Sequence, residues 1–323
     1  MGDRERGPSR IRDRDRAASR TGDRGPGRTG DRDRGPSRTA VLTAVARGLH
    51  REEPRPWVYD DNLALGLAGH AGVALRERLL ADVPRRQLMA FSRWICVRAR
   101  FAEDLVEQAV ASGIRQYVIL GAGLDSFAYR RADLTARLRV FEVDHPATQG
   151  WKRRRLISLG IARPVGLGFA PVDFERQALR AGLEEAGFDF RQPAVFSWVG
   201  VTMYLSTEAI NATLATLAGC RAGSRVVVTY NQPKLALEGI SAQVTAAFAG
   251  IAAQLGEPFV SVFLPGEMRQ LLARHGFADI VDFGAEHARA SYFDGRADVD
   301  IAGAQHLVAA TVAPARAPAP LPA

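Results

Sequence analysis

The chain has 323 residues, of which 47% are hydrophobic and 24% are charged, and its formal net charge is +8. This length suits one large α/β domain with additional elements, and two cysteines, Cys96 and Cys220, are too few for a disulfide framework. The N-terminus lacks the apolar core of a signal peptide and no stretch approaches membrane-spanning length, so we expect a cytoplasmic protein with reduced, buried thiols.

Most of the positive charge lies in residues 1–38, which hold 12 arginines and 7 acidic residues, a net +5 of the total +8. The rest of the chain therefore carries only +3, which disfavours nucleic acid as a partner. This segment repeats Gly, Asp and Arg and has almost nothing apolar to bury, so it is predicted to be a disordered tail. A solvated tail, or a start codon assigned too early, is favoured over an arm that binds RNA or a protein, because neighbouring Arg and Asp neutralise each other.

A helical cap, residues 39–115, is predicted before the first strand. Apolar residues recur there at helical spacing in three stretches: 39–49, 63–80 and 87–112. Arg98 and Arg100 lie two residues apart on the last of these helices, so their side chains face different ways. One of them is a candidate to face a ligand crevice, and the alternative is that both are solvated.

Residues 116–313 alternate between strand and helix patterns, which is typical of a parallel sheet covered by helices on both faces. The predicted strands are 117–120, 139–143, 166–172, 194–199 and 224–230, and the helices between them are 126–135, 146–159, 175–186 and 207–220. An insertion near 235–263, helical over 235–255, a helix over 265–275 and two final strands, 277–283 and 306–312, complete the core. Residues 314–323 are rich in Pro and Ala and are predicted to be a flexible tail.

The first strand ends at Gly121-Ala122-Gly123, where glycine allows a tight turn and lets a ligand lie on the main chain. The next strand ends in Asp144, and a carboxylate at that spacing usually holds a ribose diol. Together the turn and the acid favour a ligand that contains a nucleoside. The alternative for Asp144 is the N-cap of a helix with Pro146 in its first turn.

The third and fourth strands add further candidates. Asp173 could bind an adenine amino group with Phe174 stacked on the ring, or Asp173 could be another N-cap. Trp198 and Tyr204 follow as candidates to line a pocket, although single aromatic residues here are more often part of a core. The basic run 152–155 is expected on the solvated face of its helix.

These stretches, taken in order over residues 40–312, resemble the leucine carboxyl methyltransferase family. The similarity is greatest to its bacterial branch of S-adenosylmethionine-dependent O-methyltransferases, which are linked to polyketide-type small molecules. The segments that carry the resemblance are 58–64, 97–104, 118–130, 141–152, 172–174 and 196–205.

The resemblance implies a class I methyltransferase fold: a Rossmann-like sheet of seven strands, the last of them antiparallel, with S-adenosyl-L-methionine as cofactor. It implies that the glycine turn passes under the amino-acid part of the cofactor and that Arg98, of the Arg98/Arg100 pair, binds its carboxylate. Asp144 would hold the ribose, and Asp173 and Phe174 would contact the adenine.

One position departs from the family pattern. Many members have a glutamate after the fourth strand that helps to hold the cofactor's amino group, and this chain has Val199 there. A backbone carbonyl at this position would have to serve instead. The family's usual Asp-Thr-Arg is also altered, to Asp125-Ser126-Phe127.

Methyl transfer from a sulfonium requires an aligned nucleophile, and a carboxylate acceptor is already ionised at neutral pH and needs no base. A hydroxyl acceptor would need one, and His145 is the nearest candidate because Asp144 is assigned to the ribose. Tyr204 is a second candidate residue, through a cation–π contact with the sulfonium. No catalytic residue is therefore assigned, no metal is expected, and the weak case for a base favours a carboxylate.

We expect a small hydrophobic acceptor in a pocket roofed by the N-terminal helices and the 235–255 insertion, with no membrane partner. An NAD-dependent dehydrogenase would share the glycine turn and the acid, but Ser126 stands where its third glycine is required. A relative that binds the cofactor without transferring the methyl group is the other alternative, because of Val199.

Overall fold

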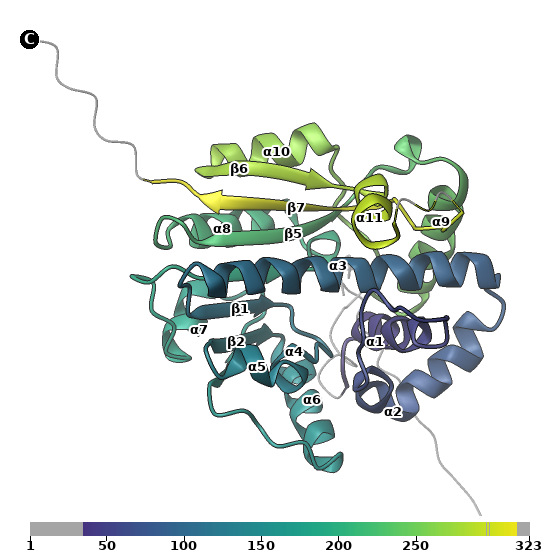
Figure 1. Ribbon diagram of the computed structural model, residues 1–323, viewed down its shortest axis with the longest axis horizontal. Coiled ribbons are helices and arrows are strands. Elements are labelled where there is room, and N and C mark those ends of the chain that lie inside the picture. Colours follow the sequence, from purple (N-terminus) through teal and green to yellow (C-terminus); the bar gives the residue numbers. More distant parts are fainter. Residues whose placement is uncertain (1–34, 295, 297, 315–323) are drawn as a thin grey trace, which may run out of the picture. The chain divides into compact units, whose positions relative to one another are not determined.

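A computed structural model of the protein describes residues 35–294, 296 and 298–314, and its centre is a seven-stranded sheet (Figure 1). The strand order is β3-β2-β1-β4-β5-β7-β6; β1 to β5 run parallel, and β7 is antiparallel to both of its neighbours. The strands are β1 Gln116–Leu120, β2 Arg139–Asp144, β3 Leu167–Pro171, β4 Val195–Trp198, β5 Arg225–Asn231, β6 Phe277–Phe283 and β7 Gln305–Val312. The predicted class I methyltransferase sheet is confirmed.

The central strand β1 is buried along its whole length, which explains its continuous apolar sequence. Val118 and Leu120 belong to the core on one face of the sheet, whereas Tyr117 and Ile119 belong to the core on the other. This alternation follows from the two-residue period of a strand. The apolar run therefore supplies both layers of the domain.

Helices cover both faces of the sheet (Figure 1). One face packs against α7 Leu179–Glu185, α8 Thr207–Ala218 and α10 Pro265–Arg274. The other face packs against α3 Arg85–Ala111, α4 Phe127–Arg130, α5 Ala132–Thr135 and α6 Pro146–Ser158. The longest of these, α3, has 27 residues and extends past the sheet.

A second group of helices gathers beyond the end of the sheet that carries the glycine turn (Figure 1). Its members are α1 Arg38–His50, α2 Ala64–Leu75, the π-helix η1 Arg76–Leu80, α9 Gly239–Gln254 and α11 Ala285–Tyr292. The projecting part of α3 joins them, since the rings of Phe91 on α3 and Phe248 on α9 are stacked with centroids 3.7 Å apart. These helices lie where open α/β sheets bind their ligands, outside the carboxyl ends of the strands.

The start of the folded chain lies slightly before the predicted boundary at residue 39. Ser37 caps α1 by accepting a hydrogen bond from the Ala40 N–H, and the Arg38 N–H donates to Glu257 at 2.9 Å. The predicted tail over residues 1–34 and the end of the chain from residue 315 lie outside the described residues.

Several helices differ from their predicted form. The stretch 63–80 is kinked at Gly69, whose φ of 55° is left-handed, and then widens into the π-helix η1. The stretch 126–135 is two short helices, because Arg131 has a non-helical ψ of 59°. The helix predicted from residue 175 begins only at Leu179, and α11, between the last two strands, was not predicted.

Lys152 contradicts its predicted place on a solvated helix face. It points from α6 onto the sheet and is 1% exposed, and its Nζ lies 2.7 Å from Oε2 of Glu142 on β2. The second carboxylate oxygen of Glu142 has no hydrogen-bond partner among the described residues. Burial raises the pKa of Glu142, and Lys152 opposes that effect. The pair fixes α6 to β2, two residues before Asp144.

Replacing Lys152 with Met should therefore destabilise the protein by about 3–5 kcal/mol, because Glu142 would remain buried without its cation. The double variant Glu142→Met/Lys152→Met should recover most of that loss, since an apolar pair replaces both charges. Urea unfolding followed by circular dichroism measures both values. A single-variant cost below about 1 kcal/mol would show that Glu142 does not depend on Lys152 as its counterion.

Candidate active site

The glycine turn after β1 is held by the end of β2. The N–H groups of Gly121 and Ala122 both donate to the carbonyl oxygen of Val143, at 2.8 and 3.0 Å. Gly121 and Gly123 have φ values of 67° and 48°, in the left-handed region that favours glycine. The predicted turn is therefore present, and the main chain of β1 reverses directly against β2.

Both glycines also allow other segments to approach the turn closely. A Cβ atom at residue 121 would collide with the side chain of Val201, and one at residue 123 would lie 3.0 Å from the Cβ of Ala40. Val201 follows β4 and Ala40 belongs to α1. The turn is thus the point where β1, β2, the loop after β4 and the first helix meet.

Asp144 closes the turn. Its carboxylate accepts the N–H of Gly123 through one oxygen and the N–H of His145, at 2.6 Å, through the other. Burial of the carboxylate raises the pKa of Asp144, and these two backbone donors act against that rise. The alternative that Asp144 caps α6 is wrong: His145 is the cap, and its Nδ1 accepts from the Ala147 N–H at 3.2 Å, with Pro146 as the first helical residue.

The surroundings of His145 and of Tyr204 limit the chemistry that each side chain can perform. A neutral imidazole whose Nδ1 accepts a hydrogen bond carries its proton on Nε2, so His145 has no lone pair left for an acceptor proton unless the cap opens. Tyr204 lies with its ring centroid 5.5 Å from that of Phe259. Burial raises the pKa of Tyr204 to about 12, so its phenol stays protonated at neutral pH. Neither side chain is poised as a general base.

Arg98 and Arg100, two residues apart on α3, have different surroundings. Arg100 forms an ion pair with Asp104 at 2.7 Å near the surface. Arg98 is buried, and its Nη1 donates to Oε1 of Gln305 at 2.7 Å. Burial lowers the pKa of Arg98 to about 10, which still leaves it charged at neutral pH. No carboxylate among the described residues pairs with this cation.

Arg98 lies next to the loop that follows β4. A Cβ atom at Gly200, whose φ is 79°, would be 2.7 Å from Nη2 of Arg98. The next residue, Val201, packs against Gly121 of the glycine turn. Two residues of one loop therefore connect the buried cation to the turn. Val199, which precedes them, is half-buried among apolar side chains and offers no carboxylate.

The residues predicted for the adenine have other contacts in this structure. The carboxylate of Asp173 accepts the Glu175 N–H at 3.1 Å, so the alternative role as the cap of a turn is present. Phe174 lies with its ring centroid 6.4 Å from that of Trp198. Trp198 is fully buried in the core, and its Nε1 has no hydrogen-bond partner among the described residues. Trp198 is therefore a core residue rather than part of a pocket lining.

Comparison with known proteins identifies the family. The model of the family described as leucine carboxyl methyltransferase matches residues 40–218, which include α1, the glycine turn, β2 and β4. The chain belongs to the leucine carboxyl methyltransferase family. It is an S-adenosylmethionine-dependent methyltransferase, and the predicted family, fold and cofactor are confirmed.

Individual relatives agree with this assignment. A "Putative S-adenosyl-L-methionine-dependent methyltransferase YktD" from Bacillus subtilis (strain 168) is 28% identical over 289 residues, which cover 80% of this chain and 92% of that protein. A relative with the same class description from Mycobacterium avium (strain 104) is 36% identical over 191 residues, 59% of this chain and 63% of that protein. This structure is also similar to the crystal structure of a "putative methyltransferase" from Thermobifida fusca YX, with a TM-score of 0.56 and 16% sequence identity. The match covers 87% of this chain and 96% of that chain, and it supports the fold alone.

Sequence reasoning missed the ion pairs that join the helices of this methyltransferase to its glycine turn. Arg47 on α1 binds Asp61 at 2.8 Å and the carbonyl oxygen of Leu124 at 2.7 Å. Glu103 on α3 accepts the Tyr59 hydroxyl at 2.9 Å and also binds Arg130 of α4. The family-like segments 58–64 and 97–104 were the available signal, but the partners come from other segments.

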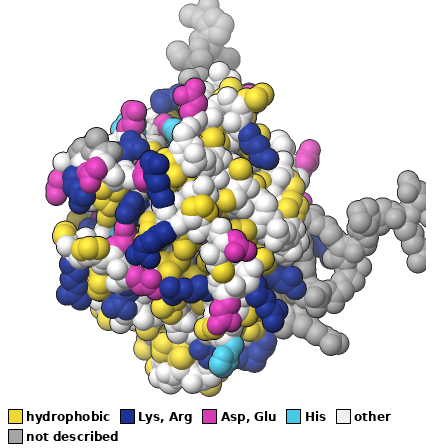
Figure 2. Space-filling view, turned by 90° about the vertical axis from the view of Figure 1, so that its right-hand side faces the viewer, with side chains coloured by type: hydrophobic (Ala, Val, Ile, Leu, Met, Phe, Trp, Pro, Cys, Tyr) yellow, Lys and Arg dark blue, Asp and Glu magenta, His cyan; other side chains and the backbone are white. Residues whose placement is uncertain are grey.

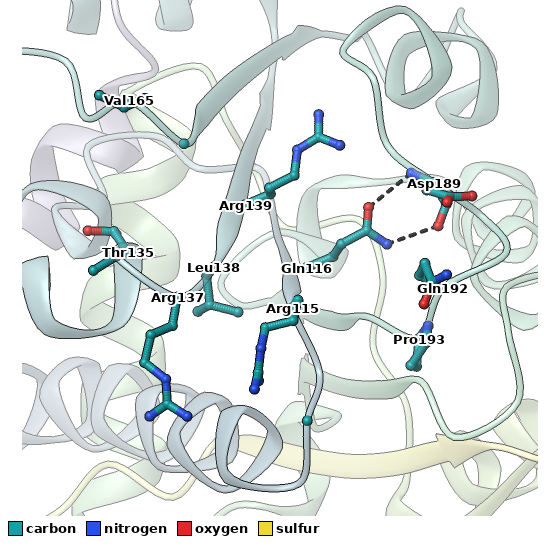
Figure 3. Close-up of a pocket in the computed structure, with 13 residues that line it drawn as sticks. Arg115, Gln116, Thr135, Arg137, Leu138, Arg139, Val165, Asp189, Gln192 and Pro193 are labelled. Carbon is teal, nitrogen blue, oxygen red and sulfur yellow. Dashed lines mark hydrogen bonds between the residues drawn. The ribbon is translucent and has the colours of Figure 1, made fainter.

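A hollow of about 610 Å³ lies at the other end of the sheet, at the start of β1 and β2 (Figure 3). Arg115, Arg137 and Arg139 are among its lining residues, and the Gln116 amide is occupied by the backbone of Asp189, with both hydrogen bonds at 2.9 Å. This hollow shares no residue with the glycine turn. It is therefore separate from the residues that meet at the glycine turn.

Within the described part of the chain, no three His, Cys, Asp or Glu side chains are grouped so that they could hold a metal ion. None of its helices combines the length and apolar character needed to cross a membrane.

Replacing Asp144 with Ala should weaken binding of S-adenosylhomocysteine by about tenfold to a hundredfold and lower the stability by about 1–3 kcal/mol, because the carboxylate closes the turn and, as predicted from the sequence, would hold the ribose. Calorimetry and urea unfolding measure the two effects. Asp82→Ala, which removes an exposed carboxylate, is the control for a general charge effect. Unchanged affinity with reduced stability would restrict Asp144 to holding the turn.

Proposed function

We propose that this methyltransferase transfers the methyl group to an oxygen of a small hydrophobic metabolite, of polyketide type, and that the oxygen belongs to a carboxylate. The cofactor part of the proposal rests on one observation: Arg98 is a buried cation that has no carboxylate partner among the described residues. A buried charge without a counterion is costly. The carboxylate of the cofactor's amino-acid part would supply the counterion.

The other roles follow from the positions around the glycine turn. Gly121, Ala122 and Gly123 would pass beneath the amino-acid part, and Asp144 would bind the ribose hydroxyls with the lone pairs that its backbone donors leave. Asp173 and Phe174 would contact the adenine once the capping turn adjusts. The cofactor supplies the electrophilic methyl group, and the protein aligns the acceptor in line with it and excludes water.

In many family members, the glutamate after the fourth strand helps to hold the amino group of the cofactor. Val199 has an apolar side chain, so we assign this contact to a backbone carbonyl of the loop after β4. The non-catalytic alternative rests on the same substitution. The ion pairs that join the helices to the turn favour an active enzyme, because they hold the crevice in a defined geometry for an acceptor.

The acceptor would enter beneath α1, α2 and α9. The face that carries these helices shows hydrophobic side chains lying among basic side chains, with fewer acidic side chains (Figure 2). An apolar surface suits a hydrophobic molecule, and the excess of basic side chains attracts an anion. Both features support a hydrophobic acid as the acceptor.

The state of His145 and Tyr204 supports the same acceptor. His145 uses Nδ1 to cap α6, and Tyr204 keeps its proton at neutral pH. A hydroxyl acceptor would need a base to take its proton, whereas a carboxylate would not. We place the reaction in the cytoplasm, where both cysteines, Cys96 and Cys220, would stay as the buried free thiols that the structure contains.

The direct test is to incubate the enzyme with cofactor labelled in its methyl group and with a set of hydrophobic carboxylic acids, phenols and alcohols. A methyl ester releases its label as methanol in mild alkali, whereas a methyl ether does not. We expect S-adenosylhomocysteine to form with an acid, and the label to be alkali-labile. An alkali-stable product would overturn the carboxylate proposal, and cofactor binding without turnover on any acceptor would support the non-catalytic alternative.

Replacing Arg98 with Met should separate function from stability. The affinity for S-adenosylhomocysteine should fall about tenfold to a hundredfold, because a charge-assisted contact is lost. The ligand-free protein should become more stable by about 1–2 kcal/mol, since a buried unpaired charge is removed. Arg100→Met, on the same helix, should change neither property appreciably. Unchanged affinity in Arg98→Met would contradict the role of Arg98.

The rate of methyl transfer should stay nearly constant from about pH 6 to 9, because a carboxylate acceptor is ionised throughout and Tyr204 does not titrate in that range. His145→Ala should lower stability by about 1 kcal/mol through loss of the cap but leave this profile flat. Initial rates measured at saturating cofactor test this. A rate that rises tenfold per pH unit and collapses in His145→Ala would indicate a hydroxyl acceptor and a histidine base.

A further inference from the structure

Arg98 is held by a residue from the far end of the chain. Oε1 of Gln305 accepts hydrogen bonds from Nη1 of Arg98 at 2.7 Å and from Nε1 of Trp94 at 3.2 Å. Nε2 of Gln305 donates to Oδ1 of Asn231 at 3.0 Å. Gln305 is the first residue of β7 and lies directly opposite Asn231 of β5 in the antiparallel pair.

The chemistry of the partners fixes the orientation of the Gln305 amide. A guanidinium and an indole N–H can only donate, so the amide oxygen must face Arg98 and Trp94. The amide nitrogen then points at Asn231, whose side-chain oxygen accepts it. Trp94 and Asn231 are both buried, so neither end of this chain of hydrogen bonds competes with bulk water.

The choice of an amide at this position preserves the charge of Arg98. A carboxylate in place of the amide would neutralise the guanidinium and occupy it with an internal ion pair. The amide instead takes one N–H and leaves the positive charge without a counterion among the described residues. The Nη2 side of the guanidinium then faces Gly200, in the loop that packs on the glycine turn.

We propose that Gln305 is a positioning residue: it orients Arg98 toward the cofactor's carboxylate and keeps the guanidinium uncompensated until the cofactor binds. This inference rests on the proposed role of Arg98 as the partner of that carboxylate. It assigns a cofactor-binding role to β7, which lies outside the segment of the chain that the family model matches, residues 40–218.

Two ligands separate this role from a merely structural one. S-adenosylhomocysteine has the amino-acid carboxylate, and 5′-methylthioadenosine has the adenosine part without it. In Gln305→Glu the affinity for S-adenosylhomocysteine should fall about tenfold to a hundredfold, because the new carboxylate pairs with Arg98. The affinity for 5′-methylthioadenosine should stay within about twofold of the wild type. Gln305→Leu should give a similar but smaller loss.

Trp94→Phe is the matched control, since it removes the other donor to the same amide oxygen and keeps an aromatic ring in the core. Its affinity for both ligands should be unchanged within about twofold. The double variant Arg98→Met/Gln305→Leu should bind S-adenosylhomocysteine no more weakly than Arg98→Met alone, because both changes remove the same contact. Circular dichroism shows whether each variant folds. If Gln305→Leu does not fold, Gln305→Glu still tests the proposal, because it keeps the shape of the side chain.

Equal loss of affinity for both ligands in Gln305→Glu would overturn the proposal, because it would show a general disturbance of the crevice. Wild-type affinity for S-adenosylhomocysteine in that variant would also overturn it, while leaving the role of Arg98 intact if Arg98→Met still binds weakly. A wild-type protein that does not bind S-adenosylhomocysteine at all would instead refute the proposed cofactor contacts themselves.

Discussion

The contact between the Asp144 carboxylate and the backbone of Gly123 and His145 is the constraint on which this site depends. It ties the end of β1 to the end of β2 and leaves the glycine turn lying open to other segments. The turn can then receive Val201 from the loop after β4 and Ala40 from α1. Elements that are distant in the sequence thus meet at one point because one carboxylate closes a turn.

Two buried cations show how charge is used differently in the same domain. Lys152 is paired with Glu142 and fixes a helix to the sheet, so its charge is balanced inside the protein. Arg98 donates to the neutral amide of Gln305 and has no carboxylate partner in the part of the chain that the structure describes, so its charge is balanced there only in part. Since an unpaired buried charge is costly, it favours binding of an anion that can enter the crevice. If Arg98 has the proposed role, this difference, rather than burial itself, distinguishes a structural cation from a binding one.

The sequence was sufficient to predict the sheet, the glycine turn and the family, because these depend on local patterns such as the apolar run of β1. It named Arg98 through the family resemblance alone and did not foresee that Lys152 is buried, because the partners that surround these two side chains come from other segments. The cap of α6 was placed one residue early for a related reason: His145 is an uncommon capping residue, and the Asp144 side chain is engaged by the glycine turn. The kink at Gly69 depends on a left-handed glycine conformation, which a helical apolar pattern conceals.

Amide hydrogen exchange with and without S-adenosylhomocysteine tests the central claim that the crevice around the glycine turn binds the cofactor. The account predicts slower exchange in segments 121–126 and 143–148 when the ligand is bound, and no change in segments 113–116 and 135–139, which line the hollow at the opposite end of the sheet. Protection confined to the hollow, with unchanged exchange at the glycine turn, would contradict it.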